Sequence, residues 1–286
     1  MKPSTLLLTG LLLGALTLTA AETPPPTTHI FAEVDGHPLA LDLHLPAASA
    51  RPPVIVWVHG GAWRAGSRKD MPLAKLVAAG YAIASVDYRL STTARFPAQI
   101  HDLKAAIRYL RANAAKLGIN TDKIAIAGAS AGAHLAALVG VTNGHRELEG
   151  TVGVTGPSSD VHAIVSFFGM SDLTTILTQS TPHGLSVRVP ALQLLLGGQP
   201  DALPALARLA SPVFHVDASD PPLLLLHGDQ DPQAPFAQSR ALRAAYQKAN
   251  RPVQFETIPG GRHGGPQFFD AERLALARKF LDSILR

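Results

Sequence analysis

Residues 123–132 read Lys-Ile-Ala-Ile-Ala-Gly-Ala-Ser-Ala-Gly, and a helical run follows from Ala133 to Val141. The first five residues predict a strand, and the glycines on either side of Ser130 predict a sharp turn before the helix. Glycine lets the backbone take a strained turn that leaves the serine hydroxyl exposed above the sheet. An isolated pattern of this kind would hold only an ordinary turn serine. Whether Ser130 is a nucleophile therefore depends on motifs elsewhere in the chain.

Strand and helix patterns alternate from residue 54 onward, which predicts an α/β fold with a mostly parallel, doubly wound sheet. Asp35-Gly36 predicts the turn of an N-terminal antiparallel hairpin. In such sheets ligands bind at the carboxyl ends of the strands. The expected strands are 30–34, 39–45, 54–58, 81–86, 124–127, 161–168, 223–226 and 253–258. The expected helices are 71–79, 98–117, 133–141, 235–249 and 266–285.

Changes in composition along the chain predict four segments: a signal, a tether, a single domain and a lid within that domain. A positive start, an apolar stretch and small residues at its end predict an export signal over residues 1–21. The apolar stretch is too short, and too often interrupted, for a membrane anchor. Residues 22–28 predict a proline-rich tether without a fold of its own, followed by one domain over 29–286. The proline-rich stretch 173–216 interrupts the alternation and predicts a small lid over the edge of the site.

Composition excludes several classes of function. The 286 residues carry a net charge of +4 without a basic block, so we expect no nucleic-acid partner. Cysteine is absent, which excludes disulfides and thiolate chemistry. The 12 histidines form no H-E-x-x-H pair, so neither a metal nor a cofactor is expected.

Two later loops could supply the base and acid that make a serine oxygen nucleophilic. The strand at 223–226 runs into a loop with two carboxylates, Asp229 and Asp231, and the strand at 253–258 runs into a glycine-lined loop with His263. Their order after Ser130 matches the serine, acid, histidine order of one hydrolase fold.

A fourth loop could stabilise a developing oxyanion. The strand at 54–58 ends in His59-Gly60-Gly61-Ala62-Trp63, a His-Gly-Gly loop, and the backbone N–H of Ala131 would be a further donor. We expect His59 to bond within its own loop. Trp63 either lines the substrate pocket or packs inside, and we treat it as substrate-binding.

These motifs together resemble the α/β-hydrolase carboxylesterases, and most of all their feruloyl and acetyl-xylan esterase-like branch, which is related to the hormone-sensitive lipase group. The resemblance covers roughly residues 30–285 and rests on the stretches 59–63, 86–90, 128–132, 168–173, 227–231 and 261–264. It implies Ser130 as nucleophile, Asp231 as acid and His263 as base. It also implies backbone N–H donors from Gly61, Ala62 and Ala131.

The resemblance implies a serine esterase that cleaves short-chain esters such as acetylated or feruloylated carbohydrate. The signal predicted over residues 1–21 makes it an exported protein, periplasmic or extracellular. Its partners would be small-molecule or carbohydrate ester substrates, without an integral membrane anchor. Two alternatives remain open. One is a serine peptidase of the prolyl-oligopeptidase type, which shares the fold and the order of the three residues, and the other is a hydrolase-like binding protein without catalysis.

Overall fold

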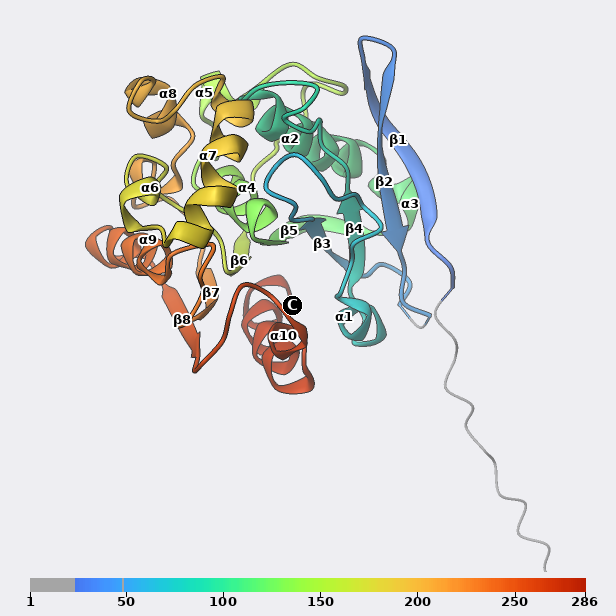
Figure 1. The fold of residues 1–286 in the computed structure, drawn as a ribbon. Coiled ribbons are helices and arrows are strands. Elements are labelled where there is room, and N and C mark those ends of the chain that lie inside the picture. Colours follow the sequence, from blue (N-terminus) through green and yellow to red (C-terminus); the bar gives the residue numbers. More distant parts are fainter. Residues whose placement is uncertain (1–23, 48) are drawn as a thin grey trace, which may run out of the picture.

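Eight strands form one sheet in the order β1-β2-β4-β3-β5-β6-β7-β8 in the computed structural model, which describes residues 24–47 and 49–286 (Figure 1). The first three strands in this order pair antiparallel, and all other neighbours pair parallel. This is the hairpin and the mostly parallel sheet that the sequence predicted. The strands are β1 Thr27–Val34, β2 His37–His44, β3 Pro53–Val58, β4 Ala82–Val86, β5 Asn120–Ala129, β6 Ala163–Phe167, β7 Leu223–Gly228 and β8 Val253–Ile258.

Helices fill most of the intervals between strands, as the alternating pattern predicted. The α-helices are α1 Ala74–Ala78, α2 Ala98–Ala112, α3 Ala114–Leu117, α4 Ala131–Gly140, α5 Arg146–Glu149, α6 Ile176–Gln179, α7 Pro182–Leu196, α8 Pro204–Leu209, α9 Phe236–Lys248 and α10 Ala271–Leu285, with 3-10 turns η1 Pro212–Phe214 and η2 Pro266–Phe268.

Two of the expected helices are divided in the structure. The helix expected over 98–117 is interrupted at Asn113, whose side-chain amide donates to the carbonyl of Tyr109 at 2.9 Å. The helix expected over 266–285 starts as a 3-10 turn, and α10 begins only after Asp270. The Asp270 carboxylate accepts the N–H of Arg273, which is an N-cap contact. In both places a short polar side chain bonds to nearby backbone and sets the helix boundary.

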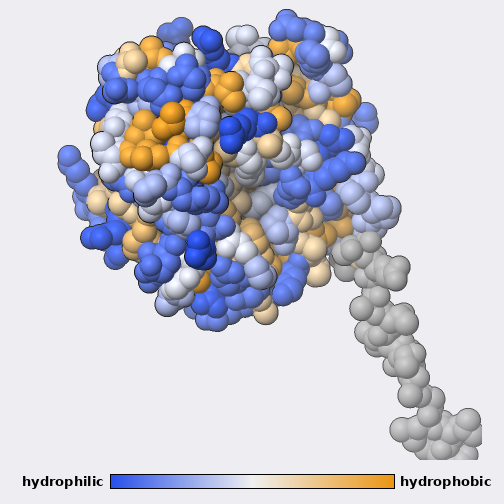
Figure 2. Space-filling model, in the orientation of Figure 1, coloured by the Kyte–Doolittle hydropathy of each residue, from blue (hydrophilic) through white to orange (hydrophobic). Residues whose placement is uncertain are grey.

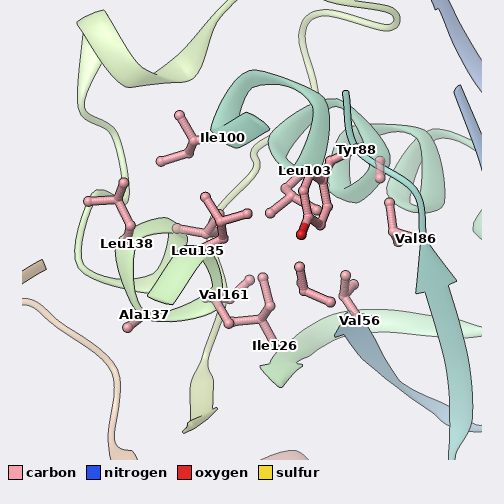
Figure 3. Packing of buried hydrophobic residues seen from close by; sticks show 14 of the residues in the cluster. Val56, Val86, Tyr88, Ile100, Leu103, Ile126, Leu135, Ala137, Leu138 and Val161 are labelled. Carbon is pink, nitrogen blue, oxygen red and sulfur yellow. The ribbon is translucent and has the colours of Figure 1, made fainter. Parts of the chain in front are cut away.

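The core lies on both faces of the sheet, because successive side chains of a strand point to opposite sides. In β3, Val54, Val56 and Val58 belong to the cluster packed under α2 and α4, whereas Ile55 and Trp57 belong to the cluster under α1 and α10. Figure 1 shows the two helix layers with the sheet between them, and Figure 3 shows the side chains of α2 and α4 meeting those of the strands. Strands covered on both faces explain the continuous apolar runs in the sequence.

The stretch 173–216 folds into three helices and a 3-10 turn rather than short irregular pieces. Three of its prolines are the first residues of α7, α8 and η1, where the missing N–H has no partner to lose. Pro190 lies inside α7, where proline costs about 3 kcal/mol. The buried side chains that follow, including Leu192 and Leu195, offset that cost by packing in the core.

The N-terminal segments are only partly described. The predicted signal at 1–21 lies outside the described residues. The expected tether at 22–28 is shorter than predicted, because β1 begins at Thr27, opposite Leu43 in β2. Within residues 24–47 and 49–286, each helix is too short or too polar to cross a membrane.

Candidate active site

Ser130 lies at the turn between β5 and α4, in a backbone conformation that is unfavourable for a residue with a side chain (φ 53°, ψ −118°). The glycines on either side make this turn possible. A Cβ at Gly128 would overlap the backbone of Gly132, and a Cβ at Gly132 would overlap the carbonyl of Val58 in β3. The helix therefore approaches β3 so closely that only glycine fits, and the serine projects from the end of the sheet.

The structure brings Ser130, His263 and Asp231 into contact in series. The Ser130 Oγ lies 2.8 Å from His263 Nε2, and His263 Nδ1 lies 2.7 Å from Asp231 Oδ2. A carboxylate only accepts, so Nδ1 carries the proton, and Nε2 of the neutral ring accepts the hydrogen bond from the serine hydroxyl. The loops after β5, β7 and β8 supply the three side chains at one edge of the sheet.

Asp231 is held as an anion by four donors. Its Oδ1 accepts the backbone N–H groups of Gln233 and Ala234, at 2.8 and 2.9 Å. Its Oδ2 accepts from His263 and, at 3.2 Å, from Nε2 of His227. Burial alone would raise the pKa of Asp231, but these histidine contacts and the backbone N–H groups lower it well below its ordinary value.

Burial lowers the pKa of His263 from its ordinary value, and the contact with Asp231 opposes that shift. The positive charges of Arg188 and, when protonated, His227 shift the pKa further in the same direction as burial. The imidazole is therefore neutral, and able to accept a proton, at neutral pH.

The loop after β3 lies against the serine. Three consecutive residues, Gly61, Ala62 and Trp63, have positive φ angles of 106°, 52° and 61°. The Gly61 carbonyl accepts the N–H groups of Arg64 and Ala65, both at 3.0 Å, which closes a turn. Among the described residues, the N–H groups of Gly61 and Ala62 have no recorded acceptor.

Ala131 is the first residue of α4, where backbone N–H groups have no partner within the helix. Its N–H also lies at the positive end of the helix dipole, which favours a negative charge nearby. Within the part of the chain that the structure describes, the N–H groups at the three positions that the sequence motifs indicated, 61, 62 and 131, have no recorded acceptor, and their role as oxyanion donors stays a prediction.

A cleft of about 450 Å³ lies beside the serine hydroxyl and the histidine ring. Its lining includes Ser130, His263 and Phe168, together with Arg188 and Gln233, which the sequence analysis did not single out. The Phe168 ring packs edge-on against the His263 ring, with the ring centroids 5.0 Å apart. Phe168 lies in the motif stretch 168–173. Arg188 lies in the proline-rich stretch 173–216, outside every motif, so the sequence contained no signal that would have identified it.

Trp63 does not line the cleft, which corrects the expectation of a substrate-binding role. Its side chain is fully buried, and its Nε1–H donates to Nδ1 of His134 at 3.1 Å. The loop reverses direction at this residue and directs the ring into the core. The alternative reading from sequence, that Trp63 packs inside, is the one that the structure shows.

Other polar residues of the motifs have local contacts. Asp229 accepts the N–H of Gly260 across to the next loop at 2.8 Å and does not contact His263. His59 donates through Nδ1 to the carbonyl of Gly60 at 2.7 Å and stacks on Tyr88, as expected for a loop contact. Asp172 accepts from Thr174 in its own turn.

Comparison with known proteins identifies the family of the chain. The family model named BD-FAE matches residues 41–246, more than half of the chain. The chain belongs to the BD-FAE family. The resemblance to α/β-hydrolase carboxylesterases of the hormone-sensitive lipase-like group, inferred from the motifs, is thereby confirmed.

Two curated relatives of this BD-FAE protein come from Mycobacterium tuberculosis. Esterase LipQ is 33% identical over 222 residues, which are 76% of this chain and 51% of LipQ. Esterase LipC is 34% identical over 216 residues, which are 74% of this chain and 53% of LipC. The chain thus spans about half the length of the curated relatives that it matches.

Solved structures share the fold along most of the chain. A structure described as a truncated form of carbohydrate esterase from gut microbiota superimposes with a TM-score of 0.80 at 34% identity, covering 92% of this chain and 98% of that one. A thermophilic esterase from Thermogutta terrifontis, Est2, gives a TM-score of 0.76 at 27% identity, with 91% and 92% covered.

Proposed function

We propose that this protein hydrolyses carboxylic esters through an acyl-enzyme formed on Ser130. The observation that carries the proposal is the unbroken series of hydrogen bonds from Ser130 Oγ through His263 to Asp231, at 2.8 and 2.7 Å. A serine becomes nucleophilic when a neighbouring base takes its proton, and the base is most effective when a carboxylate orients it. The similarity to esterases supports the same reaction class.

The first half of the proposed reaction forms the acyl-enzyme. His263 takes the proton of Ser130 as the oxygen attacks the ester carbonyl, and the backbone N–H groups of Gly61, Ala62 and Ala131 stabilise the oxyanion. Removing one such donor typically costs about 10²–10³ in turnover. The protonated imidazole, paired with Asp231, then gives its proton to the departing alcohol oxygen.

The second half repeats these steps with water as the nucleophile. His263 takes a proton from the water as it attacks the acyl carbon, and then returns the proton to Ser130 as the carboxylic acid leaves. The balance is one ester and one water consumed, and one acid and one alcohol released. No step requires a metal or a cofactor.

For the substrate, we propose short-chain esters, with acetylated or feruloylated carbohydrate as the natural class. A cleft of about 450 Å³ is of the size that binds small ligands. The similarity to a structure described as a carbohydrate esterase supports a sugar-bearing alcohol. We also propose that the protein is exported, on the pattern of residues 1–21.

The test combines covalent labelling with hydrolysis of an aryl acetate. We expect a fluorophosphonate to label Ser130 and the Ser130→Ala variant to lose both labelling and hydrolysis. Ser91→Ala is the matched control, because Ser91 is also buried and its hydroxyl has no recorded partner among the described residues. An intact protein that never labels would favour a binding protein. Faster cleavage of an aminoacyl amide than of the ester would favour a peptidase.

A further inference from the structure

Arg188 on α7 is a charged side chain that is buried at the wall of the catalytic cleft. It is 1% exposed, yet it lines the same cleft as Ser130 and His263. The helix that carries it is held against the acid loop, because Thr181 donates its hydroxyl to the carbonyl of Pro232 at 2.7 Å. The stretch 173–216 therefore places a fixed cation beside the reacting groups.

The hydrogen-bonding capacity of Arg188 is only partly used. Its Nε donates to the carbonyl of Gln233 at 3.2 Å, and its guanidinium lies 5.8 Å from the centre of the Trp63 ring. Its Nη1 is buried without a partner, and no ion pair of Arg188 is recorded in the described part of the chain. A buried charged donor that lacks a hydrogen-bond partner is costly, so an occupant that accepts from this group would recover free energy.

The charges around Arg188 favour an anion as that occupant. Burial lowers the pKa of Arg188 to about 10, so the side chain stays protonated at neutral pH. Asp231 is a nearby carboxylate, but its oxygens already accept from His263, His227 and two backbone N–H groups. A second cation, Arg64, lines the same cleft. The described residues that line the cleft therefore include two positive side chains, Arg64 and Arg188, and no carboxylate.

On the basis of the proposed function, we propose that the guanidinium of Arg188 binds a carboxylate carried by the ester substrate, so that the enzyme prefers anionic esters over neutral esters of the same shape. A guanidinium matches a carboxylate in geometry as well as charge. A neutral hydroxyl or carbonyl would accept from Nη1 but would add no negative charge to the partial compensation that Asp231 provides. The carboxylate belongs either to the acyl group or to the alcohol.

Two matched pairs of esters test the proposal and separate these sources. On the acyl side, mono-4-nitrophenyl glutarate is compared with 4-nitrophenyl pentanoate. On the alcohol side, 3-acetoxybenzoate is compared with its methyl ester. Hydrogen bonds to charged groups are worth about 1.5–3 kcal/mol, so we expect kcat/KM to favour the anionic member of one pair by about 10- to 100-fold.

Variants assign that preference to Arg188. Arg188→Met, of similar length without charge, should bring the ratio of the two kcat/KM values close to one, whereas Arg188→Lys should retain part of the preference. Arg208→Met is the matched control, because Arg208 lies on α8 and stacks on Phe214, with the guanidinium carbon 3.8 Å from the ring centre. It should leave the ratio unchanged. Product inhibition of the wild-type enzyme needs no variant. If the acyl pair shows the preference, glutarate should inhibit more strongly than pentanamide, and if the alcohol pair shows it, 3-hydroxybenzoate should inhibit more strongly than its methyl ester.

The outcomes distinguish this inference from the proposed function. A wild-type enzyme that labels at Ser130 and hydrolyses both members of each pair equally would overturn the role of Arg188 and leave the esterase proposal intact. Equal preference in wild type and in a folded Arg188→Lys would likewise overturn it. Loss of labelling at Ser130 would instead overturn the proposed function. If Arg188→Met does not fold, the ratio of kcat/KM values for Arg188→Lys and the product inhibition constants of the wild type still test whether Arg188 binds the carboxylate.

Discussion

The buried pair of His134 and Trp63 predicts a pH-dependent loss of stability that can be calculated from the structure. His134 is fully buried on α4 beneath the serine loop. Its Nε2–H donates to the carbonyl of Ala210 at 2.7 Å, and its Nδ1 accepts from Trp63. Both nitrogens are satisfied only when the ring is neutral, because a proton on Nδ1 would face the Trp63 N–H.

Burial lowers the pKa of His134 to about 4, from about 6.5 in an unfolded chain. Between these values the unfolded state binds the additional proton, so stability falls as the pH decreases. The contribution is fully present above pH 6.5 and is lost progressively as the pH falls to about 4. A shift of roughly 2.5 units corresponds to about 3 kcal/mol at 1.36 kcal/mol per unit.

The assay is urea unfolding followed by far-ultraviolet circular dichroism at pH 7, 6, 5 and 4, for the wild type and for His134→Gln. A glutamine can still accept from Trp63 and donate to Ala210, but it does not titrate in this range. Other titrating groups are common to both proteins and cancel in the difference. We expect the wild type to lose about 3 kcal/mol more than the variant between pH 7 and pH 4. Parallel curves of unfolding free energy against pH would contradict this prediction, because the fold would then not discriminate against the protonated ring.

Three further predictions concern the active site. Asp231→Asn should lower kcat by about 10⁴, as expected when the carboxylate that orients a catalytic histidine is lost. Asp229→Asn should change kcat by less than about tenfold, since Asp229 only accepts the N–H of Gly260; comparable losses in steady-state assays of the two variants would contradict this assignment. The acid limb of the pH profile of kcat/KM should have its midpoint below about pH 6.5, because burial lowers the pKa of His263 and the neutral ring is the active form; a midpoint above that value would show that the carboxylate outweighs burial. Gly132→Ala should destabilise the fold by about 1–3 kcal/mol or more in urea unfolding, because the added methyl would overlap the carbonyl oxygen of Val58 in a buried strand; unchanged stability would mean that α4 can move away from β3.

Most elements of the sheet could be predicted from the sequence because their signals are local. The strand at 124–127 is an apolar run that ends in glycine, and strands buried on both faces need such runs. Helix boundaries were less predictable. Asn113 and Asp270 end or begin helices through side-chain contacts with the backbone, which a periodic apolar pattern does not reveal.

The positions of the proposed catalytic groups were predictable for a topological reason. In a parallel sheet the loops that follow the strands lie at the same edge, so Ser130, Asp231 and His263 are brought together although they are far apart in sequence. The choice between Asp229 and Asp231 needed either the family resemblance or the structure. A single residue, Gln230, lies between these two carboxylates, and only the path of the loop determines which one faces the imidazole.

Local patterns in the sequence were enough to predict the alternation of strands and helices, the glycines that allow the strained turn at Ser130, and the loops that follow the parallel strands. Packing between distant segments fixed three further features: Trp63 is directed into the core, His227 also contacts Asp231, and α7 places Arg188 at the cleft. The difference lies in the distance along the chain over which each effect acts. Backbone strain and the apolar pattern of a strand or helix depend on residues that are neighbours in sequence. The burial of a side chain and the charges around it depend on which distant segments pack against it.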